Sequence, residues 1–136
     1  MLEEDLLEGN YGKHVVARMQ NLIRNWIPVK DKHVLVIGSS MPWIEVILLA
    51  EEVGNITTLE YNPYTSDHPK INMISPVDLA KQVKNGIAPS FDAMFTFSSI
   101  EHSGLGRYGD TLNPWGDLIT MAQSWCLLKA GTKIVT

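Results

Sequence analysis

A histidine with acidic neighbours follows an apolar run late in the chain. His102 ends the segment Ser-Ser-Ile-Glu-His, which comes directly after the run Phe91 to Phe97. A histidine titrates near neutral pH and can act as a general base, and a nearby carboxylate can orient its ring. We therefore predict His102 as a catalytic base that Glu101 or Asp110 orients. Arg107, in the same stretch, is predicted to hold an anionic group of the substrate.

The same stretch argues against two other chemistries. No Gly-x-Ser-x-Gly motif surrounds Ser98 or Ser99, so neither serine is predicted to be a nucleophile. The histidines are dispersed, and none has zinc-type spacing to a cysteine or to a second histidine, so we predict no metal site. A structural alternative stays open for two residues: Glu101 could simply accept backbone hydrogen bonds, and Arg107 could be a surface side chain.

A second group of candidates surrounds a glycine turn nearer the start. Val34 to Ile37 is a short apolar run rich in β-branched residues, which is typical of a strand buried on both faces in a parallel sheet. The run stops at Gly38, after which Ser39 or Ser40 can cap a helix over 44–53. The free N–H groups at such a helix end attract anions, including carboxylates. An ordinary strand, turn and helix without a ligand is the alternative.

An acidic residue at the end of the second predicted strand has the spacing of a ribose ligand. Glu60 follows Gly38 by 22 residues, and an acid at about this distance accepts hydrogen bonds from ribose hydroxyls in nucleotide-binding folds. A solvated acid at a strand end is the structural alternative. A dinucleotide fingerprint needs three glycines, whereas the turn has only Gly38, which disfavours a pyrophosphate and hence a nicotinamide cofactor. A ligand that presents a carboxylate does not need the close backbone approach that a pyrophosphate needs, because both serines of the turn can donate hydrogen bonds to it.

Strands that alternate with helices must position these candidates. The predicted strands are 34–37, 56–61, 71–74, 91–97 and 133–136. Two helices are predicted over 12–26 and 44–53, and a third starts at its cap Ser75 and ends near Asn85. A fourth helix starts at Asn113, and Lys129 and Gly131 end it. Its apolar face carries Leu118, Met121, Ala122, Trp125 and Leu128. The alternation predicts an α/β Rossmann-like three-layer sandwich with a mainly parallel sheet. Ligands bind such sheets at the carboxyl ends of the strands, where the segments 38–43, 60–62 and 98–110 fall together.

Length and composition suit one globular domain. The chain has 136 residues, of which 45% are hydrophobic and 19% charged. Its formal charge of −4 gives no general attraction for nucleic acid or anionic lipid. Because the acidic amino terminus lacks a secretory signal and no apolar run is long enough to cross a bilayer, we expect a cytoplasmic protein that does not enter the membrane. We expect a covering helix within 1–32, a Rossmann-like domain over 33–136, and a buried Cys126.

The pattern resembles the class I S-adenosylmethionine-dependent methyltransferases. The matching pieces are Val34 to Gly38, Glu60, Phe91-Asp92, Glu101-His102 and the Leu-Lys-Ala-Gly-Thr turn at 128–132. More narrowly, Gly-Ser-Ser-Met-Pro-Trp-Ile-Glu, Thr-Thr-Leu-Glu-Tyr-Asn, Ser-Ser-Ile-Glu-His-Ser-Gly-Leu-Gly-Arg-Tyr-Gly-Asp and Asn-Pro-Trp-Gly-Asp resemble a methyltransferase-like family catalogued as a domain of unknown function. These motifs cover the chain from about residue 33 to its end.

The resemblance implies S-adenosylmethionine as the cofactor. It implies a cofactor pocket at Gly38, Ser39, Ser40, Glu60, Tyr61 and Ser98. It further implies methyl transfer to an unidentified small molecule or glycan, with His102, Glu101 and Asp110 as catalytic residues and Arg107, Tyr108 and Trp115 against the substrate. Such folds continue beyond a fifth strand, so the resemblance also implies a sheet truncated after that strand, whose exposed edge could self-associate.

Two other functions stay open. A Rossmann-like module without catalysis, or a fragment of a larger domain, could act in protein interaction, and a folded chain that binds no adenosine ligand would favour this reading. A nicotinamide-dependent reductase is disfavoured by the missing glycines of the turn.

Overall fold

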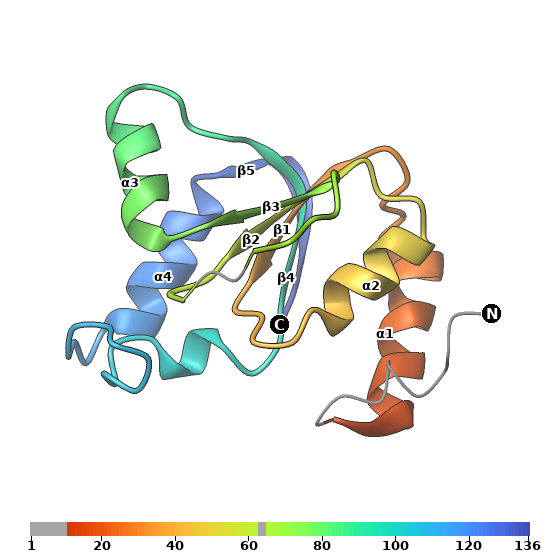
Figure 1. Ribbon diagram of the computed structural model, residues 1–136, viewed down its shortest axis with the longest axis horizontal. Coiled ribbons are helices and arrows are strands. Elements are labelled where there is room, and N and C mark those ends of the chain that lie inside the picture. The colour runs from red at the N-terminus through yellow and green to blue at the C-terminus, as the bar shows by residue number, and fades with distance from the viewer. Residues whose placement is uncertain (1–10, 63–64) are drawn as a thin grey trace.

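The computed structural model describes residues 11–62 and 65–136 (Figure 1). The elements are α1 (Gly12–Trp26), β1 (His33–Ile37), α2 (Trp43–Ala50), β2 (Asn55–Leu59), β3 (Ile71–Ile74), α3 (Pro76–Lys84), β4 (Phe91–Thr96), the short 3-10 helix η2 (Ile100–His102), α4 (Gly116–Trp125) and β5 (Leu128–Val135). The strands form one parallel sheet in the order β3-β2-β1-β4-β5. The predicted α/β Rossmann-like fold is therefore confirmed. No helix within the described ranges is long and apolar enough to cross a membrane.

The central strand β1 shows why the sheet is buried on both faces. Val34, Leu35 and Val36 are all fully buried. Because successive side chains of a strand point to opposite faces, Val34 and Val36 join one apolar cluster while Leu35 joins another. The strand order reverses at β1, which pairs with β2 on one side and β4 on the other. Ligands of open α/β sheets bind at such a switch point.

Two helices cover each face of the sheet. In Figure 1, α1 and α2 lie on one side of the strands and α3 and α4 lie on the other. The helix α1 has the predicted bounds and buries Val16, Met19 and Ile23. The start of α3 is also as predicted, because the Ser75 hydroxyl accepts a hydrogen bond from the backbone N–H of Asp78 at 3.1 Å.

The start of α2 corrects one prediction. The residue that precedes its first turn is Pro42, and no side chain caps the helix. Ser39 and Ser40 therefore do not act as caps. The Ser39 hydroxyl is instead 2.9 Å from a carboxylate oxygen of Glu45, further along the same helix. A carboxylate offers a hydroxyl donor a stronger partner than a neutral acceptor does.

The predicted end of α4 is also wrong. The helix stops at Trp125, so Lys129 and Gly131 lie within β5 rather than at a helix end. A parallel ladder from Leu128 to Phe91 competes with the helix, and Lys129 Nζ also donates to Asp92 Oδ1 at 2.6 Å.

The helix face predicted on α4 is also only partly correct. Leu118, Ala122 and Trp125 are exposed, whereas Met121 is half-buried and packs against the sheet. The prediction of a buried Cys126 is wrong as well, since this thiol is free and exposed. The chain turns toward β5 here, and Leu127 is the residue that it buries.

Candidate functional site

The glycine turn after β1 is held between two other strand ends. Gly38 has a φ of +71°, a conformation that favours glycine. A Cβ atom at this position would lie 1.8 Å from the hydroxyl oxygen of Ser99, which follows β4. The Gly38 N–H donates to the carbonyl of Leu59 at the end of β2 at 3.0 Å. The close approach of these three segments therefore requires a glycine.

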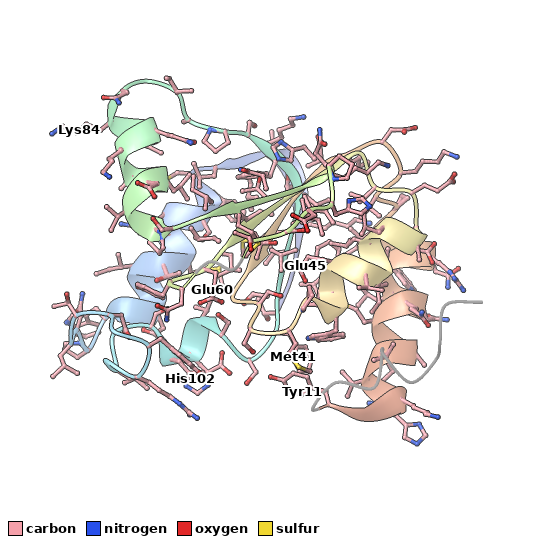
Figure 2. All side chains as sticks on the ribbon, viewed as in Figure 1. Tyr11, Met41, Glu45, Glu60, Lys84 and His102 are labelled. Carbon is pink, nitrogen blue, oxygen red and sulfur yellow. The ribbon has the colours of Figure 1, made fainter. Side chains whose placement is uncertain are left out.

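Glu60 faces this turn from the end of β2. One of its carboxylate oxygens accepts the backbone N–H of Ser39 at 2.8 Å, and the other accepts that of Tyr61 at 2.8 Å. A carboxylate has about four acceptor positions, so these bonds leave room for further donors. Figure 2 shows Glu60 near the centre of the molecule, beside the strand ends. The spacing of Gly38 and Glu60 in the sequence thus corresponds to a direct contact across the turn.

A second acidic residue supports the same turn and was not predicted as a site residue. Glu45 is fully buried in α2 and accepts hydrogen bonds from the hydroxyls of Ser39 at 2.9 Å and Thr58 at 2.8 Å. Burial raises the pKa of its carboxyl, against the opposing effect of these hydrogen bonds. The signal in the sequence was one acid inside the otherwise apolar segment Trp-Ile-Glu-Val-Ile-Leu-Leu.

Three aromatic rings form the wall of the site next to α1. Tyr11 lies with its ring centre 4.7 Å from that of Phe97 and 5.7 Å from that of Trp43. The rings of Trp43 and Phe97 are 5.3 Å apart and edge to face, an arrangement that aromatic pairs prefer. Tyr11 was not predicted because it lies far from the other candidates in the sequence. The helix α1 brings it to them.

The loop after β4 carries the predicted catalytic residues. His102 Nε2 is 3.8 Å from a carboxylate oxygen of Glu101, and its ring packs edge to face against Tyr108. Asp110 instead accepts the backbone N–H groups of Gly104, Gly106 and Tyr108, at 2.6, 3.2 and 3.2 Å. Desolvation opposes ionisation of Asp110, but these bonds outweigh it and lower the pKa of its carboxyl. All three of these hydrogen bonds come from the backbone of its own loop, so Asp110 holds the loop conformation in the described structure.

A cavity of about 790 Å³ joins these segments. The predicted site residues on its wall are Gly38, Ser39, Ser40, Glu60, Tyr61, Ser98, His102, Tyr108 and Asp110. Glu101, Arg107 and Trp115 are not on this wall: Glu101 lines a second cavity, the Arg107 guanidinium lies 5.6 Å from the Tyr108 ring centre, and Trp115 is exposed. The volume lies within the usual range for small-molecule sites.

The cavity, which we call the main cavity, also extends between α3 and α4. Its wall there includes Leu79, Val83 and Leu127, and it reaches Lys84 at the last turn of α3. In Figure 2, Lys84 lies at the top of the molecule and His102 at the bottom. The main cavity thus has a polar end at the strand termini and an apolar arm between two helices.

Comparisons with known proteins agree with this fold. Residues 31–135 match the family described as "Caenorhabditis protein of unknown function, DUF268". HcgC from Methanococcus maripaludis, cocrystallised with SAH and pyridinol, is 16% identical, with a TM-score of 0.51 over 69% of this chain and 36% of HcgC. A cyclopropane-fatty-acyl-phospholipid synthase-like protein from Lactobacillus casei is 12% identical, with a TM-score of 0.50 over 83% of this chain and 45% of that protein.

A chorismate mutase/shikimate 5-dehydrogenase fusion protein from Clostridium acetobutylicum is 13% identical, with a TM-score of 0.48 over 88% of this chain and 46% of the fusion protein. The chain therefore spans less than half the length of each of these three structures. No curated protein matches the chain. At such low identity, the likeness to HcgC and to the synthase-like protein establishes a Rossmann-like fold and nothing finer.

Proposed function

We propose that this chain, which belongs to the family described as "Caenorhabditis protein of unknown function, DUF268", binds S-adenosylmethionine at the polar end of the main cavity and takes part in methyl transfer. The observation that carries the proposal is the hydrogen bond from the Ser39 N–H to Glu60 at 2.8 Å. It aligns an acid at the end of β2 with the glycine turn after β1, the arrangement with which Rossmann-like folds hold a ribose.

The residues of the turn suit this cofactor better than a dinucleotide. Glu60 keeps a free acceptor position for a ribose hydroxyl beside its three backbone donors, the N–H groups of Ser39, Tyr61 and Asn62. The Gly38 turn carries serines instead of the two further glycines that bring backbone close to a pyrophosphate. An amino-acid carboxylate needs only hydrogen-bond donors, which the hydroxyl and N–H of Ser40 supply. HcgC, with the same fold, was crystallised with SAH, which adds support.

His102 is the proposed base. When bound, S-adenosylmethionine supplies an electrophilic methyl group. His102 lines the main cavity and is half-buried, so its ring can accept a proton from a methyl acceptor. A carboxylate oxygen of Glu101 lies 3.8 Å from Nε2 and is placed to orient the ring. Replacement of His102 by alanine should remove turnover and leave the cofactor affinity nearly unchanged.

Calorimetric titration of S-adenosylmethionine into the folded chain tests the cofactor site. We expect micromolar binding that Glu60→Ala weakens about tenfold, as for the loss of a hydrogen bond to a charged group. Glu60→Gln keeps an acceptor for the Ser39 N–H and should weaken binding less. Glu52→Gln is the matched control, because Glu52 is exposed and pairs with Lys30. A folded chain that does not bind S-adenosylmethionine would refute the proposal.

The alternative of a non-enzymatic interaction module has its own support. The exposed side of α4 presents Leu118 and Trp125, with Trp115 directly before the helix, and their side chains are 60 to 65% exposed. Exposed apolar side chains gathered on one element often mark a protein contact. If Trp125→Ser left S-adenosylmethionine binding intact but removed self-association in analytical ultracentrifugation, both functions would coexist. A monomeric wild-type chain would remove this support.

A further inference from the structure

One buried hydroxyl near the site has no partner. Thr96, the last residue of β4, is 3% exposed, and its hydroxyl makes no hydrogen bond to any described residue. It is the one such buried side-chain atom in the described ranges 11–62 and 65–136. Buried polar groups are almost always hydrogen-bonded, because an unpaired one loses its interaction with water without compensation. A ligand that hydrogen-bonds to the Thr96 hydroxyl would remove this cost.

Thr96 lines a second cavity of about 420 Å³, on the β5 side of the loop after β4. Hydroxyls on its wall come from Thr96, Ser98 and Thr136, and carboxylates come from Glu101 and Asp117. No lysine, arginine or histidine among the described residues lines it. All of these side-chain oxygens can accept hydrogen bonds, and the two carboxylates give the wall a net negative charge.

Ser98 connects the second cavity to the main cavity. It is the one predicted site residue that lines both. Its φ of +50° lies in the left-handed region, which is costly for a residue with a Cβ atom and is found most often at functional sites. A ligand in the second cavity would therefore lie beside the polar end of the main cavity, across a single residue.

The carboxylates on this wall are able to bind a ligand. The Glu101 side chain is 57% exposed, and its one described ion pair is the 3.8 Å contact with His102. Asp117 uses one oxygen to accept the backbone N–H of Leu118 at 2.8 Å, which leaves its other oxygen available. Both groups can therefore accept charge-assisted hydrogen bonds from a cation.

We propose that the second cavity binds a small hydroxylated amine, with its ammonium group against Glu101 and Asp117 and a ligand hydroxyl or amine donating to Thr96. As the methyl acceptor, a role that rests on the proposed function, its nitrogen first gives a proton, by way of the Glu101 carboxylate, to His102, whose Nε2 lies 3.8 Å from that carboxylate. The uncharged nitrogen then forms the bond to the methyl carbon, and the carbon–sulfur bond breaks with its electron pair left on sulfur. The charge of the wall disfavours anionic acceptors.

Calorimetry with glucose and two derivatives, each of which differs from glucose in one group, tests the binding class. Glucosamine is the probe, glucose is its neutral counterpart and glucuronate its anionic one, all at a pH where the amine is protonated. We expect glucosamine to bind at least tenfold more tightly than glucose, and glucuronate not to bind. Asp117→Asn and Glu101→Gln should each weaken glucosamine binding about tenfold, whereas Glu52→Gln should not change it. Equal binding of glucosamine and glucose would overturn the proposal.

Thr96→Val gives a signature that a merely structural threonine would not give. The variant keeps the shape of the side chain and removes the unpaired hydroxyl, so we expect a higher Tm together with weaker glucosamine binding. A lower Tm with unchanged glucosamine affinity would refute the role of Thr96.

The two proposals fail separately. A folded chain that binds S-adenosylmethionine but not glucosamine overturns the amine site and leaves the cofactor site standing. Glucosamine binding that Asp117→Asn weakens, in a chain that does not bind S-adenosylmethionine, supports the amine site and refutes the proposed function.

Discussion

The two faces of the sheet are built differently. On the α1 and α2 side, residues from both helices and from β1, β2 and β4 form one continuous buried cluster that includes Ile23, Leu48 and Phe95. On the α3 and α4 side the buried cluster is smaller, and α3 contributes only Leu79 to it. The main cavity extends into this second side. One face therefore provides rigidity, while the other leaves space beside the candidate site.

This difference assigns separate tasks to the helices. Because α1 and α2 bury large side chains against the sheet, they fix the glycine turn and bring Tyr11 and Trp43 to the cavity wall. The helices α3 and α4 flank the apolar arm of the main cavity and can shift without breaking a large core. Local stability tends to be lowest in elements with few buried apolar contacts, and ligand-binding segments are drawn from these elements.

Matched leucine truncations test this comparison most directly, and their effects should be the largest. Leu48 on α2 is fully buried, whereas Leu79 on α3 is 7% exposed and lines the main cavity. We expect Leu48→Ala to lower the free energy of unfolding by about 4 kcal/mol, and Leu79→Ala by about 2 kcal/mol, because the second site already adjoins empty space. Urea unfolding measures both. Equal losses would show that the two faces are packed alike.

Two glycines with the same backbone strain separate strain from crowding. Gly38 and Gly86 have φ values of +71° and +75°, but only at Gly38 would a Cβ atom meet another residue, Ser99. We expect Gly86→Ala to cost about 1–2 kcal/mol from strain alone. Gly38→Ala should cost clearly more and should also remove S-adenosylmethionine binding. Urea unfolding measures both losses of stability, and calorimetry measures S-adenosylmethionine binding. If Gly38→Ala lost no more stability than Gly86→Ala, the close approach of Ser99 to Gly38 would be contradicted.

Glu45 is the polar exception inside the denser face, and it should make stability depend on pH. Burial raises the pKa of its carboxyl above the ordinary 4.5, so the folded chain binds this proton more tightly than the unfolded chain does. Stability should therefore fall as pH rises from about 4.5 through the raised pKa. Glu45→Gln should lack this decrease, so its stability relative to wild type should grow with pH over that range. Unfolding midpoints of wild type and Glu45→Gln, measured at a series of pH values, test this. If both proteins lost stability with pH in the same way, Glu45 would not be the cause.

Asp92 lies at the start of β4, between the strands β1 and β5, and its contribution should be the smallest. A hydrogen bond from Lys129 at 2.6 Å, with one from the His33 N–H at 2.9 Å, lowers the pKa of its carboxyl. We expect Asp92→Ala to lower the free energy of unfolding by about 1 kcal/mol at neutral pH. The loss should shrink as pH falls from the ordinary carboxyl pKa of 3.8 through the lowered pKa of the folded chain, because the unfolded chain gains its proton first. A constant loss across pH would point to packing instead of charge.

The sequence predicted the elements whose local signals agree with their tertiary surroundings. The β-branched run at β1, the Ser75-Pro76 start of α3 and the apolar spacing of α1 all gave the observed elements. The end of α4 was missed because Lys129 and Gly131 form a helix-stop signal locally, while pairing of β5 with β4 decides the outcome. Glu60 could be placed from its spacing. Glu45 and Tyr11 could not, because their positions depend on packing between helices and the sheet.

The position of Cys126 allows the wild-type chain to be labelled at a single site beside the main cavity. It is the only thiol in the 136 residues, it is exposed, and it lines the apolar arm of the main cavity beside the end of α4. A thiol-reactive fluorophore would therefore attach to the wild-type chain at one known place, without the removal of other cysteines. The rate of its attachment would report whether a molecule fills the arm between α3 and α4, independently of any assay of catalysis.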